Sequence, residues 1–254
     1  MSGPLALEIA VTSAAGASIA RDGGADRVEL CSALELGGVT PSQGLVEAVV
    51  ATGIAAHVLV RARPGGFVYD ADELDTMVRE VRAIARAGAA GVVVGALDDA
   101  GALDVEAIAR FGGAAREISP DMEVTVHRAI DRAADPVAAA RSLAGLGVTR
   151  VLSSGGAPAA PLGVAVLARM VPAAGEVQVM AGAGVTAAAV PVLAATGVAA
   201  VHLSAKRRAP AAPGADGAAF VPMGDTDDDV TFVTDAAVVA EAWSAVDAWR
   251  REHS

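Results

Sequence analysis

Three polar side chains of complementary chemistry follow a short apolar strand near the middle of the chain. The segment EVTVHRAID (123–131) begins with the β-branched pattern of a buried strand and then brings His127, Arg128 and Asp131 together within five residues. A histidine and a carboxylate are the groups of general acid–base catalysis, and a guanidinium binds anions. Because charged residues make up only 19% of the chain, this cluster predicts a functional pocket.

Other expected strands also carry polar side chains, where a buried parallel sheet would normally be a near-continuous apolar run. The residues concerned, within or just after these strands, are Glu8, Glu29, Cys31, Arg61, Arg63, Ser154 and His202. Carboxyl and imidazole groups in a buried pocket acquire pKa values that suit acid–base work. The residues to which we assign a catalytic role are Glu8, Glu29, His127 and Asp131.

The third expected strand carries two arginines, Arg61 and Arg63, whose equal parity points their side chains to the same face. A guanidinium cannot lose its charge, so its burial without a partner is costly. One interpretation is an anion-binding floor, in which these two arginines and Arg128 hold a carboxylate or a phosphate. The alternative is a lattice of buried salt bridges, with Glu8 and Glu29 as the partners. The sequence leaves both interpretations open.

Two glycine-rich turns, SSGG (153–156) and AGAG (181–184), each end a strand and precede a helix. Backbone N–H groups at such turns bind anions, helped by the dipole of the following helix. The residues that these turns and the last expected strand add to the predicted substrate site are Ser154, Gly155, Gly156, Gly182, Gly184, His202 and Ser204.

Eight short β-branched runs alternate with alanine-rich segments of helical length. They lie at 5–11, 27–32, 56–63, 91–97, 123–129, 150–155, 176–182 and 199–205. Within 72–88, Leu74, Met77, Val81 and Ile84 share one face of an amphipathic helix. This alternation predicts a (β/α)8 TIM barrel that forms one domain over 1–254, with its site at the C-terminal ends of the strands. An open doubly wound sheet is the alternative, but no GxGxxG turn follows the first strand.

Net charge, the uncharged segment 177–205 and the cysteine content bear on nucleic-acid binding, membrane spanning and cellular compartment, respectively. A net charge of −11 repels phosphate backbones, so we expect no nucleic-acid partner. The segment 177–205 lacks charged residues and is long enough to span a bilayer, but its glycines and Pro191 favour strand–helix–strand over a membrane helix. The chain has one cysteine and can form no internal disulfide, which fits the cytoplasm.

The segment 206–235 interrupts the alternation of strands and helices. It is rich in proline, glycine and aspartate and is longer than an ordinary loop. A disordered connection and a lid over the site are both open interpretations. Residues 235–252 then show the pattern of a final helix.

Several long motifs resemble the copper homeostasis protein CutC family in order and spacing. They are LEIAVTS (7–13), GADRVELCSALELGGVTPS (24–42), RARPGGFVY (61–69), VTVHRAID (124–131), GVTRVLSSGG (147–156), MAGAGV (180–185) and VHLSA (201–205). The similarity runs through almost the whole chain, to VTDAAVVAEAW (233–243). It implies a TIM barrel, a cytoplasmic homodimer or larger homo-oligomer, and copper as a ligand.

The resemblance also implies a set of site residues, which are Glu8, Glu29, Arg61, Arg63, His127, Arg128, Asp131, Ser154 and His202. One position departs from the family pattern, because Gly66 stands where the family has an aspartate. Any chemistry that depends on that aspartate would be altered in this chain.

Two main functions remain open from the sequence. Copper homeostasis with copper binding is what the resemblance implies, and Cys31 is the single thiol that could ligate the metal. Cu(I) prefers several soft ligands, however, and the chain has no CxxC motif. The alternative is an enzyme that acts on a small anionic substrate through a Glu/Arg/His pocket. A metabolite sensor or a scaffold protein is the third hypothesis.

Overall fold

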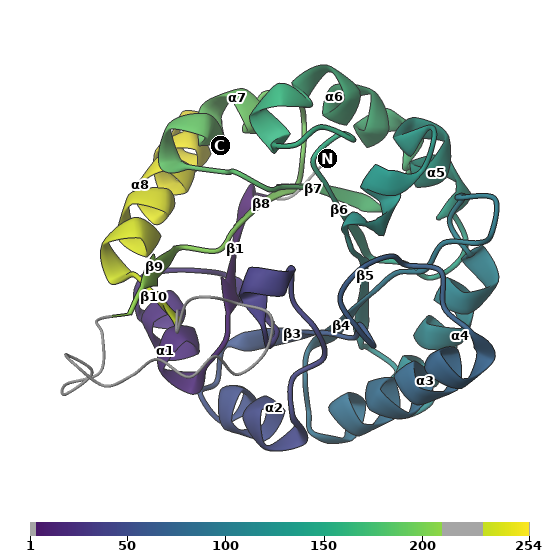
Figure 1. Cartoon of the computed structure of the whole chain (residues 1–254). Helices are drawn as coiled ribbons and strands as arrows, with labels where there is room; N and C mark the ends of the chain where they lie inside the picture. Colours follow the sequence, from purple (N-terminus) through teal and green to yellow (C-terminus); the bar gives the residue numbers. More distant parts are fainter. Residues whose placement is uncertain (1–3, 210–230, 254) are drawn as a thin grey trace, which may run out of the picture.

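Eight parallel strands close into a barrel, and helices surround it (Figure 1). The computed structural model describes residues 4–209 and 231–253. The barrel strands are β1 (Ala6–Val11), β2 (Arg27–Leu30), β3 (Ala55–Leu59), β4 (Gly91–Val94), β5 (Glu123–Val126), β6 (Arg150–Ser153), β7 (Gln178–Gly182) and β8 (Ala200–Leu203). They pair in sequence order, and β8 pairs with β1. The predicted (β/α)8 barrel is confirmed, and the closed ring rules out an open sheet.

Eight α-helices of the described ranges form the outer layer. They are α1 (Ala14–Asp22), α2 (Gln43–Val50), α3 (Ala71–Arg86), α4 (Val105–Arg116), α5 (Pro136–Ser142), α6 (Val164–Ala173), α7 (Val190–Ala194) and α8 (Ala236–Glu252). The 3-10 turns are η1 (Leu34–Leu36), η2 (Arg128–Arg132), η3 (Ala160–Leu162) and η4 (Ala187–Ala189). The strand side chains that point outward, such as Leu7 and Ile9, pack with these helices in one large apolar core.

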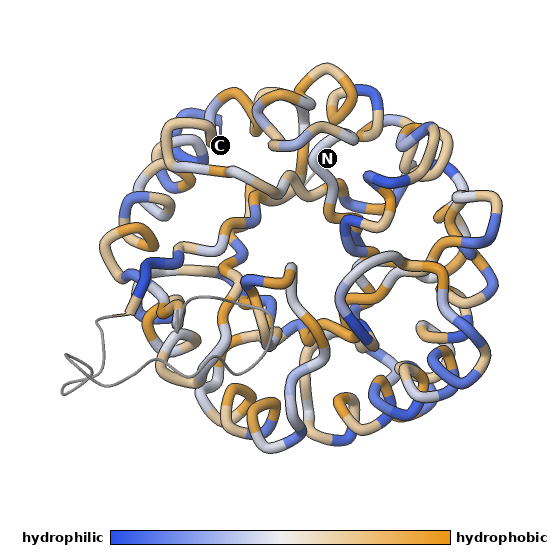
Figure 2. The backbone as a smooth tube through the Cα atoms, in the orientation of Figure 1, coloured by the Kyte–Doolittle hydropathy of each residue, from blue (hydrophilic) through white to orange (hydrophobic). Residues whose placement is uncertain are grey.

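Helix α3 illustrates how the sequence sets the helical layer. Asp70 caps its N-terminus in a reciprocal capping box with Glu73, which satisfies two backbone N–H groups. Met77, Val81 and Ile84 are buried as predicted. Figure 2 shows the corresponding change between hydrophilic and hydrophobic colours along the outer helices. The apolar stripe therefore packs α3 onto the barrel.

The segment 177–205 forms β7, η4, α7 and β8, which confirms the strand–helix–strand prediction. No helix in the described ranges is long and apolar enough to cross a membrane. Around the unusual segment, β9 (Lys206–Arg208) pairs antiparallel with β10 (Phe232–Thr234). Residues 210–230 lie outside the described residues, so the lid and the disordered connection both stay untested. The predicted final helix is α8, capped by Asp235.

Six of the eight predicted strands extend too far at their C-terminal ends, whereas β1 and β7 end where predicted, at Val11 and Gly182. β3 ends at Leu59 and β5 at Val126, whereas the apolar patterns continue to residues 63 and 129. The apolar pattern runs past the strand ends because Val60 and Ala129, which follow β3 and β5, are also fully buried. Arg61 and His127 therefore lie on the first residues of the mouth loops.

Hydrogen bonds from Arg250 join the two ends of the described chain. Arg250 of α8 donates to the carbonyl of Leu5 at 2.7 Å and to Asp26 Oδ2, also at 2.7 Å. The same Asp26 oxygen accepts the backbone N–H of Leu7 at 2.7 Å. β1, the start of β2 and the last helix are thus held at one point.

Candidate functional site

A pocket of about 560 Å³ opens at the C-terminal ends of the strands, where the active sites of TIM barrels lie. Its polar lining consists of Glu29, Arg61, His127, Arg128, Asp131, Arg132 and His202. Its apolar lining includes Leu34, Leu36, Leu59, Phe67 and Leu152. The structure therefore brings together six of the predicted side chains, from β2, β8 and the segments that follow β3 and β5.

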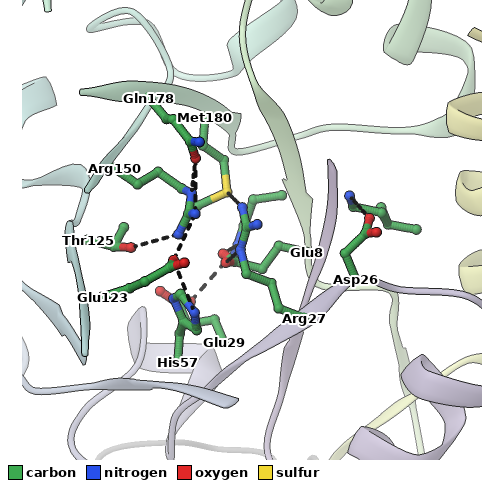
Figure 3. A network of polar contacts seen from close by, with 12 residues as sticks. Glu8, Asp26, Arg27, Glu29, His57, Glu123, Thr125, Arg150, Gln178 and Met180 are labelled. Carbon is green, nitrogen blue, oxygen red and sulfur yellow. Dashed lines mark hydrogen bonds and ion pairs between the residues drawn. The ribbon is translucent and has the colours of Figure 1, made fainter. Parts of the chain in front are cut away.

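Below this pocket, a lattice of paired charges fills the N-terminal half of the barrel (Figure 3). Arg27 donates to Glu8 Oε2 at 2.6 Å and to the sulfur of Met180 at 3.3 Å. Arg150 donates to Glu123 at 2.9 Å and to Gln178 at 3.0 Å. Each of these arginines faces a carboxylate, so the lattice is charge-compensated. The salt-bridge alternative is thus realised here, but with Arg27 and Arg150 in place of the predicted Arg61 and Arg63.

Glu8, His202 and Glu29 connect the lattice to the pocket. His202 Nδ1 lies 2.7 Å from Glu8 Oε1, and its Nε2 lies 3.7 Å from Glu29 Oε2. Burial alone would raise the pKa of Glu8, but Arg27 and His202 outweigh it and hold that pKa far below its usual range. Glu8 is therefore ionised and accepts the Nδ1–H of His202, which leaves Nε2 facing Glu29.

Glu29 is the carboxyl group of this trio that faces the pocket. Burial raises its pKa to about 7, against the lowering effect of His202 and with a smaller rise from Glu8. Burial would lower the pKa of His202, but the Glu29 and Glu8 carboxylates outweigh it and raise that pKa. Glu29 thus titrates near neutral pH, which is the range in which general acids and bases work best, and His202 keeps its proton more readily than an ordinary imidazole.

Arg61 lies at the pocket wall with only 6% of its surface exposed. Its Nη1 donates to the carbonyls of Leu36 and Gly38 at 3.3 and 2.9 Å, and its Nη2 donates to the carbonyl of Gly65 at 2.8 Å. Its Nε is buried without a hydrogen-bond partner. Among the described residues, no carboxylate forms an ion pair with Arg61. These contacts orient the guanidinium but leave its charge uncompensated.

His127 lies beside Arg61 in the pocket wall. Its Nδ1 accepts the backbone N–H of Ala129 at 3.1 Å, so the neutral ring carries its proton on Nε2, which is buried without a partner. Burial, helped by the charge of Arg61, lowers the pKa of His127 to about 3. The Phe67 ring lies 4.9 Å from the His127 ring and 5.0 Å from the Arg61 guanidinium. His127 is therefore a neutral N–H donor next to a buried cation.

Asp131 fills the SSGG turn that we predicted to bind an anion. Its carboxylate accepts the backbone N–H groups of Ser154 and Gly156 and the hydroxyls of Ser153 and Ser154, at 2.6 to 3.1 Å. It also pairs with Arg128 at 2.8 Å, and the N–H of Gly155 donates to the Ser153 hydroxyl. The backbone donors of residues 154–156 are thus already used by the chain itself.

Several other predicted residues lie away from the pocket. Arg63 pairs with Glu73 at 2.5 Å and donates to the carbonyls of Gly66 and Val68, so it ties the loop after β3 to α3. Gly66 sits on this loop, where an added Cβ would meet open space. The predicted residues outside the pocket lining are Glu8, Cys31, Arg63, Ser154, Gly155, Gly182, Gly184 and Ser204.

Gly182 has a packing role, because a Cβ there would lie 2.4 Å from Leu152 Cδ1. Ala183, in the same AGAG turn, has a φ of +84°, which is unusual for a residue with a side chain. The AGAG turn is therefore tightly packed and strained.

Cys31, the predicted metal ligand, is 1% exposed and packs against Leu59 and Val93. Burial, reinforced by the Glu29 and Glu35 carboxylates, raises the pKa of its thiol, so the thiolate that binds copper is disfavoured. Across residues 4–209 and 231–253, no three His, Cys, Asp or Glu side chains are grouped to hold a metal ion. The described donor set does not fit a copper centre.

The sequence did not reveal which charged residues pair in the lattice, nor that Phe67 packs over the pocket wall. Arg27 and Glu29 lie two residues apart on β2 and therefore point to the same face, so parity alone could have placed Arg27 inside the barrel. Glu123 and Arg150 each begin a strand, where a polar residue resembles an ordinary loop residue. No local signal in the sequence marks Phe67 as the ring that covers both Arg61 and His127.

Comparison with known proteins defines the family. The CutC family model matches residues 5–207. A CutC family protein from Xanthomonas campestris pv. campestris (strain 8004) is 44% identical over 205 residues, which cover 80% of this chain and 84% of that protein. A CutC family protein from Klebsiella pneumoniae subsp. pneumoniae is 37% identical over 250 residues, which cover 96% and 98%.

Solved structures agree with this result. One from Streptococcus agalactiae, provisionally named a copper homeostasis protein CutC, has a TM-score of 0.70 and 27% identity over 78% of this chain and 97% of that chain. KGPDC from Streptococcus mutans has a TM-score of 0.61 but only 12% identity, over 97% of this chain and 99% of that chain, and shows the fold alone. The protein thus belongs to the CutC family.

Proposed function

We propose that this CutC family member is an enzyme that moves a proton on a small anionic molecule. The observation that carries the proposal is the pairing of two features in one pocket. Glu29 has a pKa of about 7, and Arg61 is a buried cation that donates to backbone carbonyls and has no ion-pair partner among the described residues. A substrate anion would compensate Arg61 and bring its reacting atoms to Glu29.

In this mechanism, Arg61 binds the anionic group and the N–H of His127 donates a second hydrogen bond to it. Both donors are fixed before the substrate arrives, which favours electrostatic stabilisation of charge that develops in the transition state. Glu29 takes a proton from the substrate and returns it, and the neighbouring His202 stabilises the ionised form of Glu29. Glu8 holds His202 in orientation by its hydrogen bond to Nδ1. Glu8 is thus a positioning residue.

Deuterium exchange tests this proposal without knowledge of the complete reaction. The protein would be incubated in D2O with a panel of small carboxylates and phosphate esters, and solvent-derived deuterium on carbon would be followed by NMR. We expect exchange in at least one compound, and Glu29→Gln should slow it by about 100-fold or more while the fold is retained. Absence of exchange across the panel, or a rate unchanged in Glu29→Gln, would refute the role of Glu29.

Copper homeostasis is the second candidate, supported by the name of the Streptococcus agalactiae structure. Copper would then be the cargo and Cys31 its thiol ligand. The buried, protonated state of Cys31 argues against a tight Cu(I) site. An anaerobic Cu(I) titration against a competing chelator, with wild type and Cys31→Ser, distinguishes the two candidates. Stoichiometric Cu(I) binding that is lost in Cys31→Ser would support copper carriage. Weak Cu(I) binding that is the same in wild type and Cys31→Ser would refute copper carriage.

A further inference from the structure

We propose that the group held at Arg61 is a carboxylate and not a phosphoryl group. This inference deepens the proposed function and rests on it, because it assigns the class of substrate for the same pocket. Three independent features of the pocket support it: the net charge of its wall, the use of its backbone N–H groups, and the buried donors that have no partner.

The first feature is the charge. Arg128 is neutralised by its ion pair with Asp131, His202 and Glu29 face each other at 3.7 Å with opposite charges when ionised, and His127 is neutral at physiological pH. Arg132 is exposed at the rim, where water screens its charge. Arg61 therefore supplies one buried positive charge. A carboxylate carries one negative charge and matches it, whereas a phosphate monoester carries about −1.5 to −2 at pH 7.

The second feature is the supply of backbone N–H groups, on which phosphate sites in barrels and at helix N-termini depend. The turn after β6 has the sequence for such a site, but its N–H groups at Ser154 and Gly156 donate to Asp131. The N–H of Gly155 donates to the Ser153 hydroxyl. A phosphoryl group would have to displace Asp131, which already forms these bonds together with Arg128.

The third feature is a group of buried polar atoms without partners around Phe67. They are Arg61 Nε and His127 Nε2, and both belong to residues that line the pocket. Unpaired buried donors cost free energy, and two carboxylate oxygens have enough lone pairs to accept both. The Phe67 ring packs against Arg61 and His127 and forms part of the pocket wall. Phe67 lies on a loop where side chains at Gly65 and Gly66 would meet open space.

A matched set of ligands tests the assignment. Glycerate, lactate and pyruvate would be compared with glycerol 1-phosphate and inorganic phosphate by calorimetry and thermal shift at pH 7. We expect saturable binding of at least one carboxylate, at least about tenfold tighter than either phosphate compound. Arg61→Gln should weaken it by about tenfold or more, and the control Arg82→Gln, in an exposed pair with Glu117, should not.

The possible results separate this inference from the proposed function. Tighter binding of the phosphate compounds, lost in Arg61→Gln, would overturn the carboxylate assignment and leave the anion pocket intact. No Arg61-dependent binding of any anion would overturn both. The variant Asp131→Ala provides a second test, because removal of its carboxylate frees the backbone N–H groups of the SSGG turn and should increase affinity for inorganic phosphate. A folded Asp131→Ala protein that does not bind phosphate would contradict the argument from the turn. If that variant does not fold, the comparison of ligands on the wild type decides.

Discussion

The two halves of the barrel interior hold similar side chains in opposite states of pairing. In the N-terminal half, Arg27 and Arg150 each face a carboxylate at hydrogen-bond distance. In the C-terminal half, Arg128 pairs with Asp131, but Arg61 donates its hydrogen bonds to backbone carbonyls and His127 keeps an unpaired N–H. Buried charges are normally paired, so Arg61 is the point at which the proposed ligand would bind. The same residue types are structural at one end and available for chemistry at the other.

The strongest way to test this contrast is to remove one arginine from each half. Arg27→Met leaves the buried Glu8 without its cation, and we expect a loss of about 3–5 kcal/mol in the free energy of unfolding. Arg61→Met removes a charge that has no ion-pair partner, and its three carbonyl acceptors lie on mouth loops near water, so we expect a loss of at most about 2 kcal/mol. Urea unfolding at pH 7 measures both, and equal losses would abolish the distinction.

A smaller effect concerns the pH dependence of Glu29. Its folded-state pKa of about 7 lies above the ordinary 4.5, so the folded protein binds an extra proton between these values. Its contribution to stability is complete below pH 4.5 and is lost as pH rises through about 7, by up to about 3 kcal/mol. Glu8 and His202 are the charged groups that face it and modulate this dependence.

Glu29→Gln should therefore flatten the stability profile between pH 5 and 8 and make the protein more stable than wild type at pH 8. Urea unfolding at several pH values measures the profile. Glu47→Gln, on α2 where Glu47 is exposed, is the control and should leave the profile unchanged. A wild-type profile that already lacks this fall would contradict the raised pKa.

The smallest effect concerns backbone strain at the pocket end. Ala33, Ala183 and Ala205 are the described non-glycine residues with positive φ, and they follow the C-terminal ends of β2, β7 and β8. Ala183→Gly relieves the strain at φ +84° and should stabilise the protein by about 1 kcal/mol. Ala168→Gly, on the exposed face of α6, should destabilise it by about the same amount. Thermal unfolding of both variants would reveal a wrong sign directly.

The sequence was sufficient to predict the barrel because its signals are local and repeated. Met77 and Val81 mark a buried helix face, and the β-branched runs mark strands. The site was harder to predict, because parity shows which side chains point inward but not how they pair. Arg61 and Arg63 share a parity, yet the loop after β3 carries Arg63 out to Glu73. Several arginines were candidate partners of Glu8, and only the folded structure shows that Arg27 is the one that pairs with it.

The predicted anion-binding turn carries a related lesson. SSGG has the composition of a phosphate-binding turn, and the sequence also contains Asp131 in a separate segment. Nothing in either segment alone shows that the carboxylate of one enters the turn of the other. That contact depends on the adjacency of β5 and β6 in the ring. Turn motifs predict what a backbone can bind, but tertiary structure decides whether the chain itself has filled it.

The hydrogen bonds of Arg250 have a consequence for how the chain folds during synthesis. Arg250 bonds to the carbonyl of Leu5, a contact between residues 245 positions apart, and β1 cannot pair with β8 until residues 200–203 have been made. Such long-range contacts close large loops and slow folding. The nascent chain must therefore leave the ribosome with an unpaired edge on β1, and this edge is open to chaperones or to wrong partners until the last helix emerges.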